Sequence, residues 1–63
     1  MRFPKLKAKR AELGITQQEM ADRLGITIMS YNYKENGKRE FNTVEILNIL
    51  NILQCKFEDV FMQ

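Results

Sequence analysis

The sequence contains no histidine and a single cysteine, Cys55, among its 63 residues. One cysteine excludes an internal disulfide, and one thiol without any imidazole excludes a structural zinc site. Nucleophilic catalysis is also disfavoured, because there is no histidine to act as a base and Cys55 follows an apolar stretch. We therefore expect no enzyme activity, no metal and no cofactor, and we expect Cys55 to be a packing residue.

Long apolar runs are also missing. No stretch reaches the ~18 consecutive apolar residues of a membrane-spanning helix. The basic N-terminus has no apolar stretch behind it, so a signal peptide is not predicted. A cytoplasmic location without a membrane partner is expected. A fold of this size is also expected to lack a pocket of the ~300–1,000 Å³ that small-molecule sites occupy, so no small-molecule substrate is predicted.

The chain has room for one small domain, which we predict to span residues 1–63. A chain of this length buries only about 60% of its unfolded surface on folding, so its stability is expected to be marginal. Small domains often gain stability from a disulfide, a metal or a partner subunit. Because the first two are excluded, a second subunit is the remaining source, and a homodimer is expected.

Charge is distributed unevenly although its net value is only +2. Residues 1–11 contain five basic side chains and no acidic one. Residues 41–63 contain three acidic side chains and one basic one, for a net charge of −2. A basic segment at one end suits an anionic partner on one side of the fold. The alternative is that the lysines only keep an exposed helix surface soluble.

Helix starts are marked by capping signals. Thr16 precedes Glu19, and Asn42 precedes Glu45, by the spacing of a capping box. Apolar residues flank both caps at the positions of a hydrophobic staple, and Thr27 is flanked in the same way. These independent agreements predict three helix starts more firmly than helix propensity alone.

Helix ends are predicted by glycine. Gly14, Gly25 and Gly37 each follow a helical stretch, where a residue at positive φ ends a helix. Pro4 lies where a first helix can begin, because its missing N–H has no partner there in any case. No segment alternates long enough to form a strand. The sequence therefore predicts an all-α fold, a compact bundle of five short helices at about 5–13, 17–24, 28–36, 43–53 and 57–61.

Only three residues separate the second and third predicted helices, so these helices must cross steeply, as in a helix-turn-helix at about 17–36. The segments LKAKRAELGITQQEMADRLGI, ENGKRE and FEDVF together resemble the Cro/CI-type (XRE-like, lambda-repressor-like) helix-turn-helix family of phage repressors and bacterial transcriptional regulators. The resemblance covers residues 6–61. It implies a sequence-specific DNA-binding regulator, most simply a repressor that binds a pseudo-palindromic operator as a dimer.

The resemblance also implies residue roles on double-stranded DNA, with the third helix in the major groove. The base-reading positions would be Ile28, Met29, Ser30, Asn32 and Tyr33. The phosphate-binding positions would be Gln17, Gln18, Asn36, Lys38 and Arg39. A partly buried bidentate ion pair is expected between Arg10 and Glu35.

Two of the base-reading positions are apolar. One interpretation is that Ile28 and Met29 contact the C5 methyl group of thymine, while Ser30 and Asn32 supply hydrogen bonds and Tyr33 meets a phosphate or a sugar. A second interpretation is an exposed apolar patch that binds another protein, as in an antitoxin or an anti-repressor. A third is that one of the two side chains folds back onto the core.

Two residues of the third helix depart from the family pattern. Tyr31 stands where Ile or Val is usual, and its hydroxyl needs a partner if its ring is buried. Lys34 stands at a position that is usually apolar. We expect its aliphatic stem to cover the core while its ammonium group reaches solvent or a phosphate.

The fourth predicted helix and the residues after it are unusually apolar. One interpretation is a central helix buried on several sides, because its apolar band is wider than the roughly 100° that a surface helix needs. The other is that part of this band meets a second subunit, and the two are compatible. The candidates for a dimer interface are Phe57, Val60, Phe61 and Met62.

Overall fold

The computed structural model describes residues 2–62. Its helices are α1 (Pro4–Glu12), α2 (Gln17–Leu24), α3 (Ile28–Glu35), α4 (Thr43–Leu53) and α5 (Phe57–Val60). The predicted all-α fold is confirmed, and each predicted boundary agrees with the structure to within one residue. No segment of the described range forms a strand.

Both predicted capping boxes form. Thr16 Oγ1 accepts a hydrogen bond from the backbone N–H of Glu19 at 3.0 Å, and the Glu19 carboxylate accepts one from the N–H of Thr16 at 3.3 Å. Asn42 and Glu45 make the same reciprocal bonds at 2.8 and 2.9 Å. Each box provides acceptors for N–H groups that the first turn of a helix leaves without a partner.

The three glycines adopt positive φ, as predicted, and α4 ends in a different way. Gln54, directly after α4, has a φ of 54° and is the only non-glycine residue with positive φ in the described range. Its side-chain amide donates to the carbonyl of Asn51 at 2.9 Å, which supplies a partner for one of the last carbonyls of the helix. Glycine spacing could not have located this helix end.

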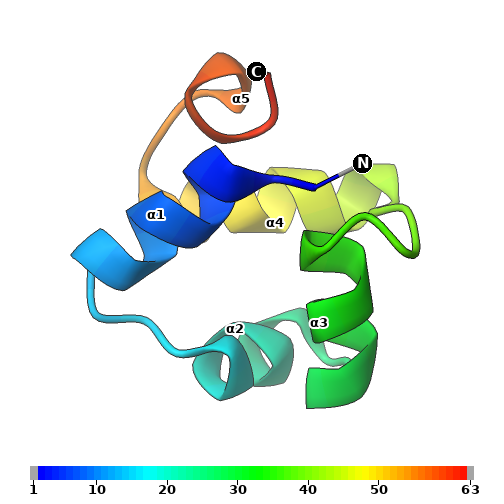
Figure 1. The fold of residues 1–63 in the computed structure, drawn as a ribbon. Coiled ribbons are helices and arrows are strands. Elements are labelled where there is room, and N and C mark those ends of the chain that lie inside the picture. The colour runs from blue at the N-terminus through cyan, green and yellow to red at the C-terminus, as the bar shows by residue number, and fades with distance from the viewer. Residues whose placement is uncertain (1, 63) are drawn as a thin grey trace.

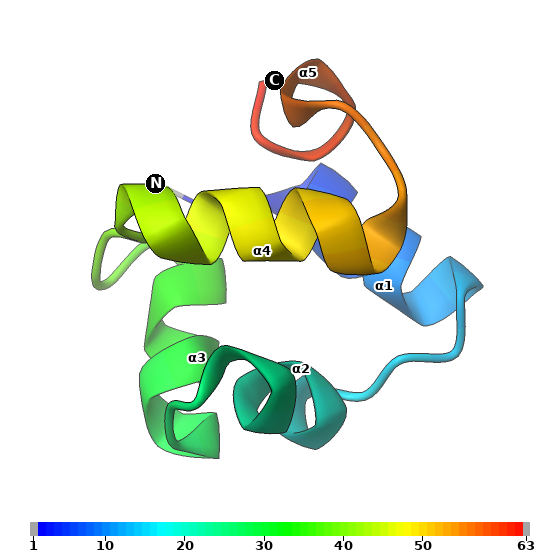
Figure 2. The same ribbon diagram turned by 180° about the vertical axis from the view of Figure 1, so that it is seen from behind.

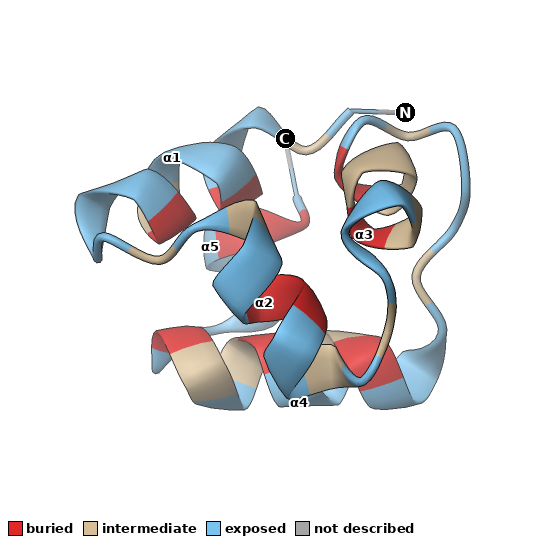
Figure 3. Cartoon of the chain, turned by 90° about the horizontal axis from the view of Figure 1, so that it is seen from below, coloured by how far each residue is buried: buried red, intermediate tan, exposed pale blue. Residues whose placement is uncertain are grey.

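Helix α4 crosses the middle of the fold, and α1 lies across it (Figures 1 and 2). The α2–α3 pair lies on one side of α4, and α5 lies on the other. Helix α1 packs against α5, and α2 packs against both α3 and α4. The buried faces of the helices point toward one another (Figure 3). No helix within residues 2–62 combines the length and the apolar character needed to span a membrane.

Every helix contributes to the hydrophobic core. Its fully or nearly fully buried members are Leu6, Met20, Ala21, Tyr31, Ile49, Leu53, Val60 and Phe61. Phenylalanine rings extend this core, because Phe61 lies 5.3 Å from Phe3, 5.7 Å from Phe41 and 5.2 Å from Phe57 between ring centroids. Edge-to-face and offset ring pairs at these distances are favourable beyond the area that they bury.

Two of the residues predicted at a dimer interface are core residues instead. Val60 is 1% and Phe61 7% exposed. The physical reason is that α5 packs its apolar side against α1 of the same chain. Phe57 and Met62 remain exposed, at 46% and 54%.

Helix α4 is buried along one side only. Ile49 and Leu53 are in the core, whereas Val44 and Leu47 are 66% and 60% exposed. The interpretation of a helix buried on several sides is therefore correct for only part of its apolar band. The rest of the band is an apolar surface of the chain.

The capping box at the start of α4 can be tested by Asn42→Ala. The change removes the side-chain acceptor for the Glu45 N–H, so we expect the free energy of unfolding to fall by about 1 kcal/mol in urea titrations followed by circular dichroism. Asn48→Ala is the matched control, because Asn48 is exposed in the interior of the same helix, where alanine is the better helix former. Equal stability of the two variants would contradict the role of Asn42.

Candidate nucleic-acid interface

Helices α2 and α3 are joined by a turn of three residues, Gly25, Ile26 and Thr27. Gly25 has a φ of 72°, and the N–H of Ile26 donates to the carbonyl of Ala21 at 3.0 Å. Thr27 Oγ1 then caps α3 by accepting from the N–H of Ser30 at 3.1 Å. A β-carbon at Gly25 would meet no neighbouring atom, so the backbone conformation is what favours glycine there. The turn sets the direction in which α3 leaves the fold.

A buried carboxylate, that of Glu35, holds α3 against the rest of the chain. Arg10 donates to it from Nε at 3.0 Å and from Nη2 at 3.1 Å, which is the bidentate pair that the family resemblance implies. Tyr31 Oη donates at 2.6 Å, and Gln17 Nε2 donates at 3.2 Å. Arg10 also donates to the carbonyl of Ile15 at 2.7 Å. Among the described residues, no buried side-chain nitrogen or oxygen lacks a partner.

The hydrogen bonds decide the charge of this cluster. Burial alone would raise the pKa of Glu35, but the hydrogen bonds from Arg10, Tyr31 and Gln17 outweigh burial and hold that pKa below its ordinary value of 4.5. The hydrogen bond to Glu35 raises the pKa of Arg10, and burial raises the pKa of Tyr31. At neutral pH the cluster is therefore a carboxylate and a guanidinium with a neutral phenol.

Gln17 connects the Glu35 cluster to the outer side of α3. Its Nε2 donates to Glu35, and its Oε1 accepts from Asn32 Nδ2 at 3.2 Å. Both side-chain amides are thereby oriented. Asn32 keeps its oxygen and one N–H for a partner outside the chain, and Gln17 keeps one N–H. A predicted phosphate-binding residue and a predicted base-reading residue are therefore hydrogen-bonded to each other.

The first turn of α3 presents apolar side chains to the outside. Ile28 is 44% exposed and Met29 is 63% exposed. Neither folds back onto the core, so that interpretation is wrong. Ser30 and Tyr33 are half-buried beside them. The surface of α3 thus combines methyl groups, a hydroxyl group and an oriented amide on one short helix.

The remaining predicted phosphate-binding residues fall into two groups. Gln18 Nε2 donates to Asp22 Oδ1 at 2.9 Å, along the surface of its own helix, and Asn36 Nδ2 donates to the carbonyl of Asn32 at 2.9 Å. Each of these two side-chain amides therefore already donates one hydrogen bond within the chain.

The second group consists of the exposed residues Lys38 and Arg39, in the loop after α3. Their cationic groups lie near the ring of Tyr33. The loop thus brings both cations to the last turns of the helix that carries the predicted base-reading residues.

Lys34 does not extend to solvent or to a partner outside the chain. Its Nζ lies 2.5 Å from Glu45 Oε2, and the two side chains are only 13% and 8% exposed. The expectation that this ammonium snorkels outward is therefore wrong, because a carboxylate at the start of α4 lies within reach. The sequence identified Glu45 only as a capping residue. By contrast, Tyr31 and Glu35 are four residues apart on one helix, a spacing that could have indicated their hydrogen bond.

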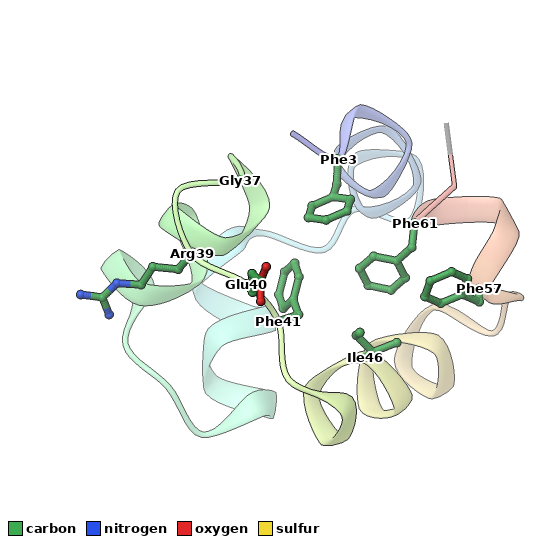
Figure 4. Close-up of a pocket in the computed structure, with 8 residues that line it drawn as sticks. All are labelled: Phe3, Gly37, Arg39, Glu40, Phe41, Ile46, Phe57 and Phe61. Carbon is green, nitrogen blue, oxygen red and sulfur yellow. The ribbon is translucent and has the colours of Figure 1, made fainter. Parts of the chain in front are cut away.

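An open hollow of about 420 Å³ lies beside α4 and α5. Its volume falls within the range that a fold of this size was not expected to enclose, but the hollow is open to solvent. Phenylalanine rings line much of it, and Arg39 points away from it (Figure 4). Its only other charged lining residue is Glu40, which is exposed. Within residues 2–62, no group of three histidine, cysteine, aspartate or glutamate side chains is placed to hold a metal ion.

Comparison with known proteins gives a consistent family. A family model described as helix-turn-helix matches residues 6–60. The uncharacterized HTH-type transcriptional regulator YqaE of Bacillus subtilis (strain 168) is 43% identical over 53 residues, which make up 84% of this chain and 46% of that protein. The chain thus spans about half the length of this curated relative.

The crystal structure of the clp gene regulator ClgR from C. glutamicum has the same fold. The two structures give a TM-score of 0.75 over 87% of this chain and 71% of that one, at 22% sequence identity. The chain belongs to the helix-turn-helix family, of the XRE-like type that its sequence predicts.

The Glu35 cluster predicts a pH-dependent effect of Tyr31→Phe. At neutral pH the variant loses a hydrogen bond to a buried carboxylate, and we expect the free energy of unfolding to fall by about 1.5–3 kcal/mol. Because the pKa of Glu35 lies below 4.5 in the folded chain, the stabilisation is fully present above that pH. It is lost as the pH falls through the folded pKa, so the two proteins should converge in acid.

Urea titrations at pH 7 and at stepwise lower pH measure this effect. Tyr33→Phe is the matched control, since Tyr33 is a half-buried tyrosine on the same helix and Tyr31 is the one that donates to Glu35. A constant difference between Tyr31→Phe and the parent chain across the whole range would show that Glu35 is not the group responsible.

Proposed function

We propose that this protein is a sequence-specific DNA-binding transcriptional regulator that places α3 in the major groove. The observation that supports this most strongly is the exposed first turn of α3, next to an oriented Asn32, on a helix held by the buried Glu35 cluster. A major groove about 12 Å wide admits one such helix. Membership of the helix-turn-helix family supports the same orientation.

Base reading is assigned to the outer side of α3. Asn32 retains one acceptor and one N–H, which are the groups that a bidentate contact with adenine requires. Ile28 and Met29 are exposed enough to meet the C5 methyl groups of thymine. Ser30 completes the set, and Tyr33 lies at the edge of this surface, toward the loop after α3. An A·T-rich half-site is therefore expected.

Phosphate binding is assigned to the ends of the motif. The free N–H of Gln17 lies at the N-terminus of α2, where backbone N–H groups favour an anion. Lys38 and Arg39 flank the other end of α3. Gln18 and Asn36 are weaker candidates, because their amides already have partners within the chain.

We further propose that residues 1–63 act as one DNA-binding domain, which works in the cytoplasm as a homodimer and represses transcription by blocking polymerase. Two half-sites about one helical turn apart would form a pseudo-palindromic operator. The support for a dimer is the exposure of four large apolar side chains, those of Val44, Leu47, Phe57 and Met62. Val60 and Phe61 contribute only by holding α5 in place.

A second function, a protein-interaction module such as an antitoxin or an anti-repressor, is favoured by the same exposed Ile28 and Met29. Apolar side chains on a protruding turn suit a protein partner as well as thymine methyl groups. The two functions differ in their salt dependence, because only the first needs phosphate contacts.

Selection of bound duplexes from a random pool, followed by titration at several salt concentrations, separates the two. We expect a two-fold symmetric consensus. With about six phosphate contacts per dimer, the affinity should fall ~10³-fold between 50 and 200 mM salt. Asn32→Ala should relax the preference at one base pair per half-site, whereas Lys38→Ala should weaken all sequences alike. Asn48→Ala on α4 should change neither. Lack of binding to any duplex at low salt would favour the protein-interaction module.

A further inference from the structure

The loop after α3 is built around Tyr33. The backbone N–H groups of Lys38 and Arg39 both donate to the carbonyl of Tyr33, at 2.8 and 3.3 Å. Gly37, with a φ of 79°, reverses the chain so that these bonds can form, and its own N–H donates to the carbonyl of Lys34 at 3.1 Å. This is the hydrogen-bond pattern of a Schellman cap, which turns the chain back along its helix.

Because the chain turns back, both cationic side chains return to the ring of Tyr33. Lys38 Nζ lies 5.5 Å and Arg39 Cζ 5.6 Å from the ring centroid. Both distances are within the ~6 Å range of cation–π attraction. Figure 4 shows the Arg39 side chain directed away from the apolar hollow that its own residue borders. Both cations thus lie within cation–π range of the same ring.

The neighbouring carboxylate, that of Glu40, is exposed and forms no ion pair with either cation. Lys38 and Arg39 are exposed, and within residues 2–62 neither of them forms an ion pair. Exposed cations without an ion-pair partner favour an anionic partner, and attraction to a ring does not neutralise their charge. A backbone phosphate of double-stranded DNA bound by α3 is the anion that this position offers.

We propose that the ring of Tyr33 is a positioning platform that holds Lys38 and Arg39 ready to bind the phosphate backbone of DNA beside the recognition helix. The inference rests on the proposed DNA-binding function and adds to it a residue role. Tyr33 acts through the two cations and not by reading a base. Cations that the ring already orders lose less side-chain freedom when the phosphate binds.

A double-mutant cycle on the selected duplex tests this role. Tyr33→Leu should weaken binding about fivefold, and equally for all sequences, because the cations lose their platform. Tyr33→Phe keeps the ring and should bind like the parent chain. In the background of Lys38→Ala with Arg39→Ala, Tyr33→Leu should have no further effect. Circular dichroism and thermal melting show that each variant is folded.

Two results would overturn the proposal. If Tyr33→Leu weakens binding by the same factor with and without the two cations, the ring acts directly on DNA. If Tyr33→Phe weakens binding as much as Tyr33→Leu, the hydroxyl is the active group.

Failure of the proposed function gives a different result, because the parent chain then binds no duplex at low salt. In that case NMR of the free protein still tests the platform. Ring-current shifts on the side-chain protons of Lys38 and Arg39 that disappear in Tyr33→Leu are expected, and their absence in the parent chain would contradict the platform itself.

Discussion

The structure depends on one buried carboxylate, that of Glu35, and on the donors around it. Arg10 of α1, Gln17 of α2 and Tyr31 of α3 all donate to it, so a single charge fixes three helices relative to one another. Burial of an ion pair contributes little net stability, because desolvation opposes the attraction. Loss of one partner is different, since it leaves an unpaired charge inside and costs about 3–5 kcal/mol. A small domain has a total stability of only about 5–15 kcal/mol, so the loss of one partner of Glu35 would remove a large part of it.

Hydrogen bonds also connect Glu35 to the exposed side of α3. Gln17 is hydrogen-bonded to both Glu35 and Asn32, so the position of Glu35 also orients the Asn32 side chain. The ion pair between Lys34 and Glu45 connects the last turn of α3 to the capped start of α4. The N–H of Phe3 also donates to the Glu35 carbonyl at 3.2 Å, so the segment before α1 is attached to the same turn. A helix held at its middle and in its last turn presents its exposed side chains in one arrangement, which lowers the entropy lost when a partner binds.

The parts of this structure that are local in sequence could be predicted, and the parts that depend on distances between helices could not. Capping boxes at Thr16 and Asn42 join residues three apart, so they fixed the helix boundaries. The pair of Arg10 and Glu35 was predicted because the family resemblance supplied it. The bonds from Asn32 to Gln17 and from Lys34 to Glu45 link separate helices at spacings with no periodic meaning. Apolar pattern alone also could not separate a core residue such as Phe61 from an exposed residue such as Phe57.

We propose that the outer side of α3 and the two ends of its motif form the face that meets DNA. The most direct measurement is backbone amide NMR during titration with the selected duplex. We expect the shift changes to concentrate at residues 17–18, 28–33 and 36–39. The exposed side of α4 around Val44 and Leu47 should stay unchanged, or change only with dimer formation and independently of DNA. Changes centred on α4 and α5, with the amides of α3 unaffected by saturating duplex, would contradict it.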